Sequence, residues 1–163
     1  MPAREPLGFE SSLVISASPL RIISAFFDPQ ALADWWQVAR SVTTARTLGA
    51  YAVEWDATDF RDDVLGPLGG TFHGTVMEFS AVRGFFIADA YWLPPEGDPI
   101  GPMGLEVTCA VDRHGTLVRV AQRGYEEGAR WRRYYEVIGS GWSRALESLK
   151  AYLEQQSGKN SSS

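Results

Sequence analysis

The chain has 163 residues, of which 45% are hydrophobic and 21% charged, a composition that suits one globular domain with a sizeable core. Its net charge of −5 opposes a general attraction to nucleic acid or to anionic lipid, so neither is expected as a partner. No apolar run reaches the length of a membrane span, and the first residues lack the apolar core of a signal peptide. The single cysteine, Cys109, excludes an internal disulfide, and we expect a cytoplasmic protein.

Composition divides the chain into three parts. Residues 1–8, with two prolines, predict a flexible N-terminal arm, and the polar residues 157–163 predict a disordered tail. Residues 9–156 between them carry the periodic apolar pattern of one folded domain, without an internal repeat or linker.

The folded part begins with a strand and two short helices. Residues 9–17 place apolar side chains at every second position, which predicts a half-buried strand. Ser18 precedes Pro19, and Asp28 precedes Pro29; each pair combines a helix N-cap with a proline at the first helical position. Two short helices are therefore expected directly after the strand.

The second short helix ends in two adjacent tryptophans, Trp35 and Trp36. Together with Leu32 they stand at i, i+3 and i+4, so both rings project toward one apolar side. They either pack in the core, which is the more frequent role of aromatic residues at helical spacing, or they contact a bound molecule.

The middle of the chain has the pattern of antiparallel strands. Its strand-like segments are rich in β-branched and aromatic residues and are separated by turn signals. They are residues 42–48, 50–55, 71–79, 85–93, 105–112 and 116–124. Two longer connections, an acidic one at 56–70 and a proline- and glycine-rich one at 94–104, predict loops that are functional or mobile.

A long helix is expected over residues 129–156, about 40 Å at 1.5 Å per residue. Its apolar residues form a continuous stripe at helical spacing. The stripe comprises Trp131, Tyr134, Tyr135, Ile138, Trp142, Ala145, Leu146, Leu149, Tyr152 and Leu153. Gly139 and Gly141 interrupt it, each costing about 1 kcal/mol relative to alanine, which suggests that the sheet or a ligand approaches the helix there.

The order of these elements predicts an α+β fold. A curved antiparallel sheet of six or seven strands, wrapped around the long C-terminal helix, is the economical way to bury the apolar stripe. Two short helices follow the first strand of that sheet.

Four stretches resemble the START-like helix-grip (SRPBCC) superfamily, in the branch of the C-terminal domain of the heat-shock protein 90 ATPase activator. They are ISASPLRIISAFFDPQALADWW (15–36), GGTFHGTVME (69–78), GTLVRVAQRGY (115–125) and GWSRALESLKAYLE (141–154). The resemblance implies an elongated cavity between sheet and long helix, which the two short helices help to close. The superfamily includes lipid carriers, cyclases and co-chaperones, so the resemblance leaves the function open.

The cavity that the resemblance implies would be bounded by apolar and aromatic side chains. The residues expected to contact a ligand are Trp35, Trp36, Phe72, Trp92, Val118, Val120, Gln122, Ile138 and Trp142. Among them Gln122 is a neutral polar group on a strand face whose other members are apolar. It suits either the orientation of a ligand carbonyl or hydroxyl, or a hydrogen bond to a neighbouring side chain.

The strand at 85–93 leaves its inward face undecided. One face carries Phe85, Ile87, Asp89 and Tyr91, which would make Asp89 a buried acid and a candidate functional group. The other face carries Phe86, Ala88, Ala90 and Trp92. The second face is preferred as the cavity lining because its small residues leave space.

No catalytic set, metal site or cofactor site is recognisable. His73 on a strand and His114 in a turn have no evident partner, and Cys109 alternates with apolar residues as a buried core thiol would. These three residues also lack the spacing of a zinc or iron site.

Three arginines, Arg130, Arg132 and Arg133, crowd the start of the long helix, where positive charge is mildly unfavourable. Arg132 and Glu136, four residues apart, can form a compensating pair. The cluster is either a solvated helix start or a contact for an anionic partner.

The sequence therefore predicts a domain that binds an apolar or aromatic small molecule in a cavity between sheet and helix. The alternatives are an enzyme of the polyketide cyclase or hydrolase kind and a co-chaperone-like interaction domain. The resemblance further implies association into a homodimer, for which the exposed face of the sheet would offer Val14, Tyr51 or Val53 as contacts.

Overall fold

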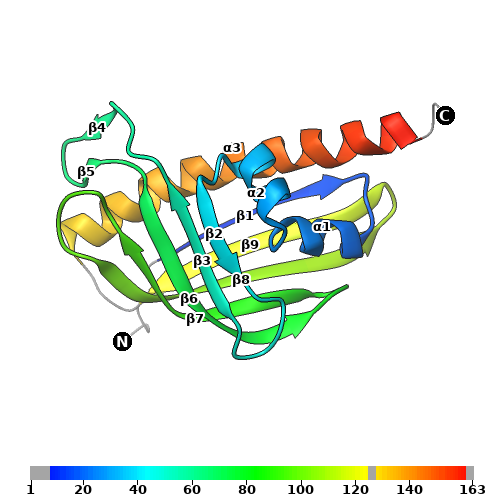
Figure 1. The fold of residues 1–163 in the computed structure, drawn as a ribbon, viewed down its shortest axis with the longest axis horizontal. Coiled ribbons are helices and arrows are strands. Elements are labelled where there is room, and N and C mark those ends of the chain that lie inside the picture. Colours follow the sequence, from blue (N-terminus) through cyan, green and yellow to red (C-terminus); the bar gives the residue numbers. More distant parts are fainter. Residues whose placement is uncertain (1–7, 125–127, 161–163) are drawn as a thin grey trace, which may run out of the picture.

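The computed structural model describes residues 8–124 and 128–160, which form a curved antiparallel sheet packed against helices (Figure 1). The seven strands of the sheet are, in order across it, β1 (Gly8–Ile15), β9 (Gly115–Gly124), β8 (Ile100–Asp112), β7 (Gly84–Leu93), β6 (Gly70–Ser80), β3 (Ala50–Trp55) and β2 (Arg40–Thr43). A separate two-stranded hairpin consists of β4 (Arg61–Asp62) and β5 (Gly66–Pro67).

Three helices accompany the sheet, and the longest runs along it (Figure 1). They are α1 (Pro19–Ala25), α2 (Pro29–Trp36) and α3 (Ala129–Asn160). The side chains of Ser18 and Asp28 cap α1 and α2 by accepting hydrogen bonds from the backbone N–H groups of Arg21 and Gln30. The predicted α+β fold, with seven strands, two short helices and a long C-terminal helix, is confirmed.

The long helix begins at Ala129, as predicted, and continues to Asn160, past its expected end at Gln156. Residues 161–163 of the expected tail lie outside the described residues. So do residues 1–7 of the expected arm.

Two strands differ from their expected bounds by more than two residues. β2 ends at Thr43 rather than at Leu48, because residues 44–49 form a tight turn in which the N–H of Gly49 donates to the carbonyl of Arg46. β8 begins at Ile100, inside the segment expected to be a loop, since the side chain of Ile100 is buried opposite Trp92. The prolines and glycines of 94–104 thus do not prevent pairing at this irregular part of the ladder.

The acidic connection at 56–70 is folded locally as the β4–β5 hairpin. Asp62, although charged, is buried, and its carboxylate accepts hydrogen bonds from the backbone N–H groups of Val64 and Leu65, both 3.0 Å. These bonds close the turn between the two short strands, as an Asp side chain commonly does.

Strand β7 changes the side toward which its buried side chains point. Phe85 and Ile87 are buried in its first half, and Ala90 and Trp92 in its second half. Between them lies Asp89, with a φ of 50°, at a register shift where β7 has one residue more than β6. An extra residue in one strand of an antiparallel pair is a β-bulge, and it reverses the alternation beyond it.

The bulge decides the inward face that the sequence left open. The expected cavity face was correct at Ala90 and Trp92 and wrong at Phe86 and Ala88, which are only half-buried. Asp89 itself is exposed, so it is not a buried acid.

One core fills the space between the sheet and the helices. Tyr51 and Val53 of β3 are buried in it, and the Tyr51 hydroxyl donates to the carbonyl oxygen of Phe26, 3.0 Å away. The expectation that these two residues form an exposed contact face is therefore wrong. Their alternation points them toward the connection between α1 and α2 rather than toward solvent.

The backbone of Asp89 generates a stability prediction. Asp89→Gly should keep or raise the free energy of unfolding, because glycine adopts a positive φ freely. Asp89→Val should lower it by about 1–2 kcal/mol, because a β-branched side chain is disfavoured in the left-handed region. Chemical denaturation measures both changes. Ala88→Val is the control, and an equal loss at the two positions would contradict the prediction.

Candidate functional site

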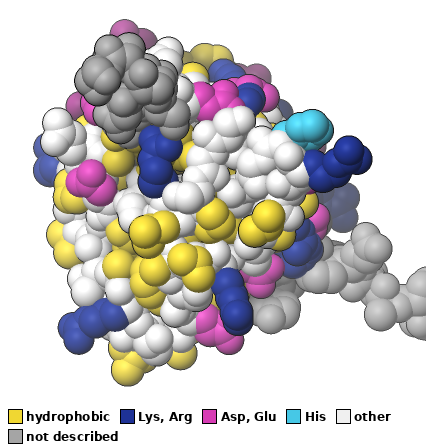
Figure 2. All heavy atoms as spheres, turned by 90° about the vertical axis from the view of Figure 1, so that its right-hand side faces the viewer, with side chains coloured by type: hydrophobic (Ala, Val, Ile, Leu, Met, Phe, Trp, Pro, Cys, Tyr) yellow, Lys and Arg dark blue, Asp and Glu magenta, His cyan; other side chains and the backbone are white. Residues whose placement is uncertain are grey.

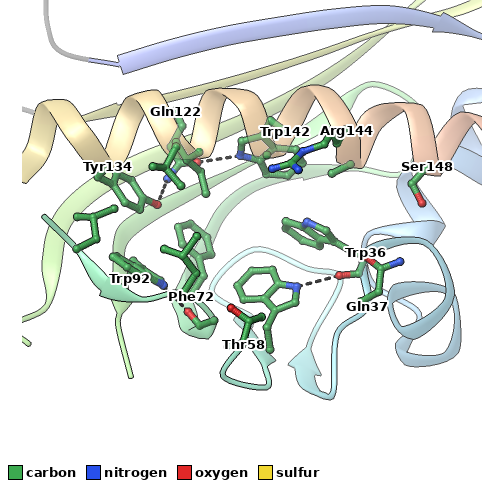
Figure 3. A pocket seen from close by; sticks show the side chains of 18 of the residues that line it. Trp36, Gln37, Thr58, Phe72, Trp92, Gln122, Tyr134, Trp142, Arg144 and Ser148 are labelled. Atoms are coloured by element: carbon green, nitrogen blue, oxygen red, sulfur yellow. Dashed lines mark hydrogen bonds between the residues drawn. The ribbon is translucent and has the colours of Figure 1, made fainter. Parts of the chain in front are cut away.

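A pocket of about 720 Å³ lies between α2, α3, the sheet and the segment that carries the β4–β5 hairpin (Figure 3). The sheet contributes Phe72 from β6, Trp92 from β7 and Gln122 from β9. The opposite side is formed by residues of α3 that face the sheet at helical spacing. These are Tyr134, Val137, Ile138, Gly141, Trp142, Arg144, Ala145 and Ser148.

Four tryptophans form an aromatic cluster at the α2 end of the pocket. Trp35 and Trp36 stack with their ring centroids 5.0 Å apart and 4° between their planes. The ring of Trp36 also lies 4.8 Å from that of Trp142 and 5.0 Å from that of Trp55. Trp35 is buried and its Nε1 donates to the carbonyl of Ala25, whereas Trp36 and Trp55 are only half-buried. The stacked pair thus extends from the core to the pocket.

At the other end of the pocket, Trp92 stacks on Tyr134 with the ring centroids 5.4 Å apart. The indole Nε1 of Trp92 donates to the carbonyl of Gly69 at 2.8 Å, which connects β7 to the segment just before β6. Both rings are buried, so this end of the pocket is rigid and, except for the hydroxyl of Tyr134, apolar.

A buried amide bridges the sheet and the long helix. The Gln122 Oε1 accepts a hydrogen bond from Trp142 Nε1 at 3.0 Å, and its Nε2 donates to the Tyr134 hydroxyl oxygen at 2.7 Å (Figure 3). Gln122 Nε2 also contacts Met103 Sδ at 2.8 Å. Gln122 therefore lines the pocket and at the same time makes the hydrogen bonds to neighbouring side chains that were its alternative role.

The rim of the pocket is polar. Gln37, Asp56, Thr58 and Arg144 line it and are exposed. Within the described ranges, Arg144 forms no ion pair, so its positive charge remains available at the mouth.

An ion pair attaches the β4–β5 hairpin, which forms one wall of the pocket, to α3. Arg133 donates from Nε and Nη2 to Oδ1 of Asp62, at 2.8 and 2.7 Å. Together with the backbone bonds from Leu65 and Val64, this guanidinium lowers the pKa of Asp62 from 3.8 to about 2. Leu65, beside the turn, then faces the pocket.

The arginine cluster at the start of α3 thus has two defined roles in the fold. Besides binding Asp62, Arg133 pairs with Glu136 at 3.1 Å, in place of the expected pair with Arg132. Arg130 donates to the carbonyl of Asp98 at 2.5 Å. The cluster therefore holds both long connections against the helix.

The nine residues predicted to contact a ligand divide into two groups. Seven line the pocket: Trp35, Trp36, Phe72, Trp92, Gln122, Ile138 and Trp142. The other two, Val118 and Val120, point inward as predicted but are fully buried in the core. They precede Gln122 on β9 and lie outside the residues that line the pocket.

Two aromatic residues of the pocket, Trp55 and Tyr134, were not predicted. Trp55 continues the every-second-residue pattern of Tyr51 and Val53. This alternation predicts that Trp55 faces the pocket, provided that the face with Tyr51 and Val53 is known to point inward. Tyr134 precedes Ile138 and Trp142 at intervals of four residues on α3. Helical spacing alone would have placed it on the pocket side.

The titratable groups singled out from the sequence lie elsewhere. His73 stacks on Tyr91 with ring centroids 5.9 Å apart, and neither it nor Asp89 or Cys109 lines the pocket. Burial raises the pKa of the Cys109 thiol to about 11. Among the residues that the structure describes, no three His, Cys, Asp or Glu side chains are gathered so that they could hold a metal ion.

A curved antiparallel sheet that holds a long C-terminal helix over a pocket defines the START-like helix-grip fold, so the resemblance drawn from the four motifs is confirmed at the level of the fold. A structure of a protein from Chromobacterium violaceum is 25% identical with a TM-score of 0.64, covering 91% of this chain and 99% of that one. The Aha1 dimer from Colwellia psychrerythraea is 19% identical with a TM-score of 0.61, covering 91% and 96%. The AHSA1 protein from Silicibacter pomeroyi is 12% identical with a TM-score of 0.67, covering 92% and 99%.

The other comparisons give no information on function. No protein-family model matches the chain, and a search of curated proteins returns no match. Within the described residues, no helix has the length and apolarity required to cross a membrane.

The Asp62–Arg133 pair generates a pH-dependent prediction. The pKa of Asp62 is lower in the folded protein than in the unfolded chain, so its stabilisation is complete above about pH 4 and is lost as the pH falls through about 2. Asp62→Asn should therefore lower the melting temperature at pH 7, and the difference from the unmodified protein should shrink as the pH falls from about 4 to about 2.

Thermal unfolding of both proteins between pH 2 and pH 7 measures this difference. Asp63→Asn, which removes the neighbouring exposed carboxylate, is the matched control. A difference for Asp62→Asn that stays constant over the whole pH range would show that the charge of Asp62 does not stabilise the fold.

Proposed function

We propose that this chain is a cytoplasmic one-domain protein, folded over residues 9–156, that binds an elongated apolar or aromatic small molecule between the sheet and α3. The observation that carries the proposal is a pocket of about 720 Å³ walled by tryptophan, tyrosine, phenylalanine and aliphatic side chains. Small-molecule sites typically have volumes of about 300–1,000 Å³ and such a lining, with a few polar groups.

Gly141 supports the proposal that the space is kept for a ligand. A Cβ added at this residue would have no atom within 4 Å, although Gly141 lies on α3 among pocket-lining residues. A glycine inside a helix costs about 1 kcal/mol relative to alanine. The local packing does not require a glycine at position 141, whereas a ligand lying against the helix backbone would require one. At Gly139, by contrast, the strand residue Phe9 is already at contact distance.

The distribution of charge favours binding over catalysis. The inner part of the pocket is lined by neutral side chains, while Asp56 and Arg144 lie on its exposed rim. General acid–base chemistry requires titratable groups placed against the reacting atoms. The polar rim instead suits a ligand whose polar end extends toward solvent.

A protein–protein interaction is a second candidate function, and exposed apolar residues at one end of the sheet favour it. Leu48 in the β2–β3 turn, Val82 in the β6–β7 turn and Val111 beside the β8–β9 turn are 71%, 52% and 87% exposed. The register of the strands brings these turns to the end of the sheet opposite the β4–β5 hairpin. Figure 2 shows hydrophobic side chains gathered on this side of the molecule, with basic and acidic side chains around them. The proposed homodimer would use this surface.

The first prediction from the pocket is that filling it weakens binding without unfolding the protein. Gly141→Leu should project its side chain into the pocket and lower the affinity for N-phenylnaphthylamine, an uncharged fluorescent probe, by more than about tenfold, or 1.4 kcal/mol. The free energy of unfolding should stay equal or rise, because leucine is a better helix former than glycine.

Probe fluorescence and quenching of tryptophan emission report binding, and chemical denaturation reports stability. The matched control is Ser140→Leu, which adds the same side chain to an exposed position of α3 next to Gly141. Unchanged affinity in Gly141→Leu, or absence of saturable binding to the unmodified protein, would contradict the proposed function.

The second prediction concerns association. If the exposed end of the sheet joins two copies, sedimentation velocity at tens of micromolar should detect a dimer that Leu48→Asp together with Val111→Asp converts to a monomer, since burying the introduced charges would be costly. Val42→Asp, another exposed apolar residue, is the control. A monomer for the unmodified protein at this concentration would reject the homodimer.

A further inference from the structure

The direction of one hydrogen bond in the pocket is fixed by chemistry. The indole Nε1 of Trp142 is a donor and has no acceptor capacity. The atom of Gln122 that lies 3.0 Å from it must therefore be the oxygen Oε1, because two donors would face each other if the amide were turned over. Trp142 thus sets the orientation of the Gln122 amide.

The same orientation determines what the Tyr134 hydroxyl does. With Oε1 toward Trp142, the Nε2 of Gln122 points at the oxygen of Tyr134, at 2.7 Å. The tyrosine oxygen accepts this hydrogen bond, so its own hydrogen has to be directed away from Gln122. Among the residues that the structure describes, none accepts a hydrogen bond from the Tyr134 hydroxyl.

The position of Tyr134 places this unused donor in the pocket. Its side chain lines the pocket, is 2% exposed, and is held by stacking on Trp92 (Figure 3). Burial raises the pKa of the phenol, so the hydroxyl keeps its hydrogen at neutral pH. A buried donor without an acceptor is costly, and a ligand oxygen would remove that cost.

We infer that the Tyr134 hydroxyl donates a hydrogen bond to an oxygen acceptor of the bound molecule. This inference rests on the proposed function and narrows its ligand class to apolar or aromatic compounds that carry an oxygen acceptor, such as ketones, esters or acids. The acceptor oxygen lies at the inner end of the pocket, next to Trp92 and Gln122. Arg144, ten residues farther along α3, lies about 15 Å away along the helix axis and can bind a second polar group at the rim.

Most other donors of the inner pocket are already used within the protein. The indole N–H groups of Trp92, Trp55 and Trp142 donate to Gly69, Trp36 and Gln122. The indole of Trp36 has no acceptor among the described residues, so it is the one alternative donor that the test has to separate from Tyr134.

The experiment compares benzophenone with 1,1-diphenylethylene, the alkene of nearly the same shape in which a CH₂ group replaces the carbonyl oxygen. Each compound displaces N-phenylnaphthylamine from the unmodified full-length protein. Benzophenone should bind about fivefold more tightly, the difference expected for one neutral hydrogen bond. In Tyr134→Phe the preference for benzophenone should disappear. The affinity of this variant for the alkene is measured alongside, so that the loss of one hydrogen bond is separated from a general change in the shape of the pocket.

Tyr135→Phe is the matched control. Tyr135 is the neighbouring buried tyrosine, it does not line the pocket, and its hydroxyl has no hydrogen-bond partner among the described residues. Its replacement should keep the fivefold preference. Infrared spectra add a direct readout, because the carbonyl stretch of bound benzophenone should shift to lower wavenumber in the unmodified protein and in Tyr135→Phe, but not in Tyr134→Phe.

Failure of the inference can be told apart from failure of the proposed function. If both compounds bind the unmodified protein with equal affinity, or if the preference persists in Tyr134→Phe, Tyr134 is not the donor and the inference is overturned while small-molecule binding stands. Loss of the preference in Trp36→Phe would then identify Trp36 as the donor. If the probe itself does not bind the unmodified protein, the proposed function fails and the inference fails with it. If the probe binds but neither compound displaces it, the inference is overturned while small-molecule binding stands.

Discussion

The Gln122 amide is the polar contact on which the shape of the pocket depends. It is buried, it comes from the sheet, and it bonds to two aromatic residues of the long helix, Trp142 and Tyr134. Apolar packing alone would let α3 slide or close onto the sheet, because dispersion contacts have little directionality. Hydrogen bonds of fixed direction hold the helix in one register and thereby keep the space beside them open.

The aromatic residues of the pocket have two roles: some are part of the core and others face the pocket. Trp35 is part of the core and donates to a backbone carbonyl, whereas its stacked neighbour Trp36 is half-buried beside Trp55 and Trp142. The two interpretations of the tryptophan pair, core and ligand contact, therefore apply to different members of the pair. The buried ring of Trp35 supports the half-buried ring of Trp36, which remains available to contact a ligand.

The hairpin side of the pocket depends on electrostatics rather than on a large apolar contact. Asp62 and Arg133 attach a short two-stranded unit to the helix, and Leu65 beside them completes the wall. A wall of this kind can move more easily than the sheet or α3, because its local stability derives from few contacts. Access to the pocket is then expected from this side, where the rim residues Asp56 and Thr58 are exposed.

The sequence by itself determined the kinds of element and their order, because caps such as Ser18–Pro19, alternation in strands and the stripe of α3 are local patterns. It also indicated the pocket residues Trp35 and Trp36 of α2, but only Ile138 and Trp142 among the eight that line the pocket from α3. Only the tertiary structure decided the inward face of β7, where the bulge at Asp89 reverses the alternation, and the burial of Asp62 against Arg133, 71 residues away. Such features depend on register and on distances between remote residues, which local periodicity does not encode.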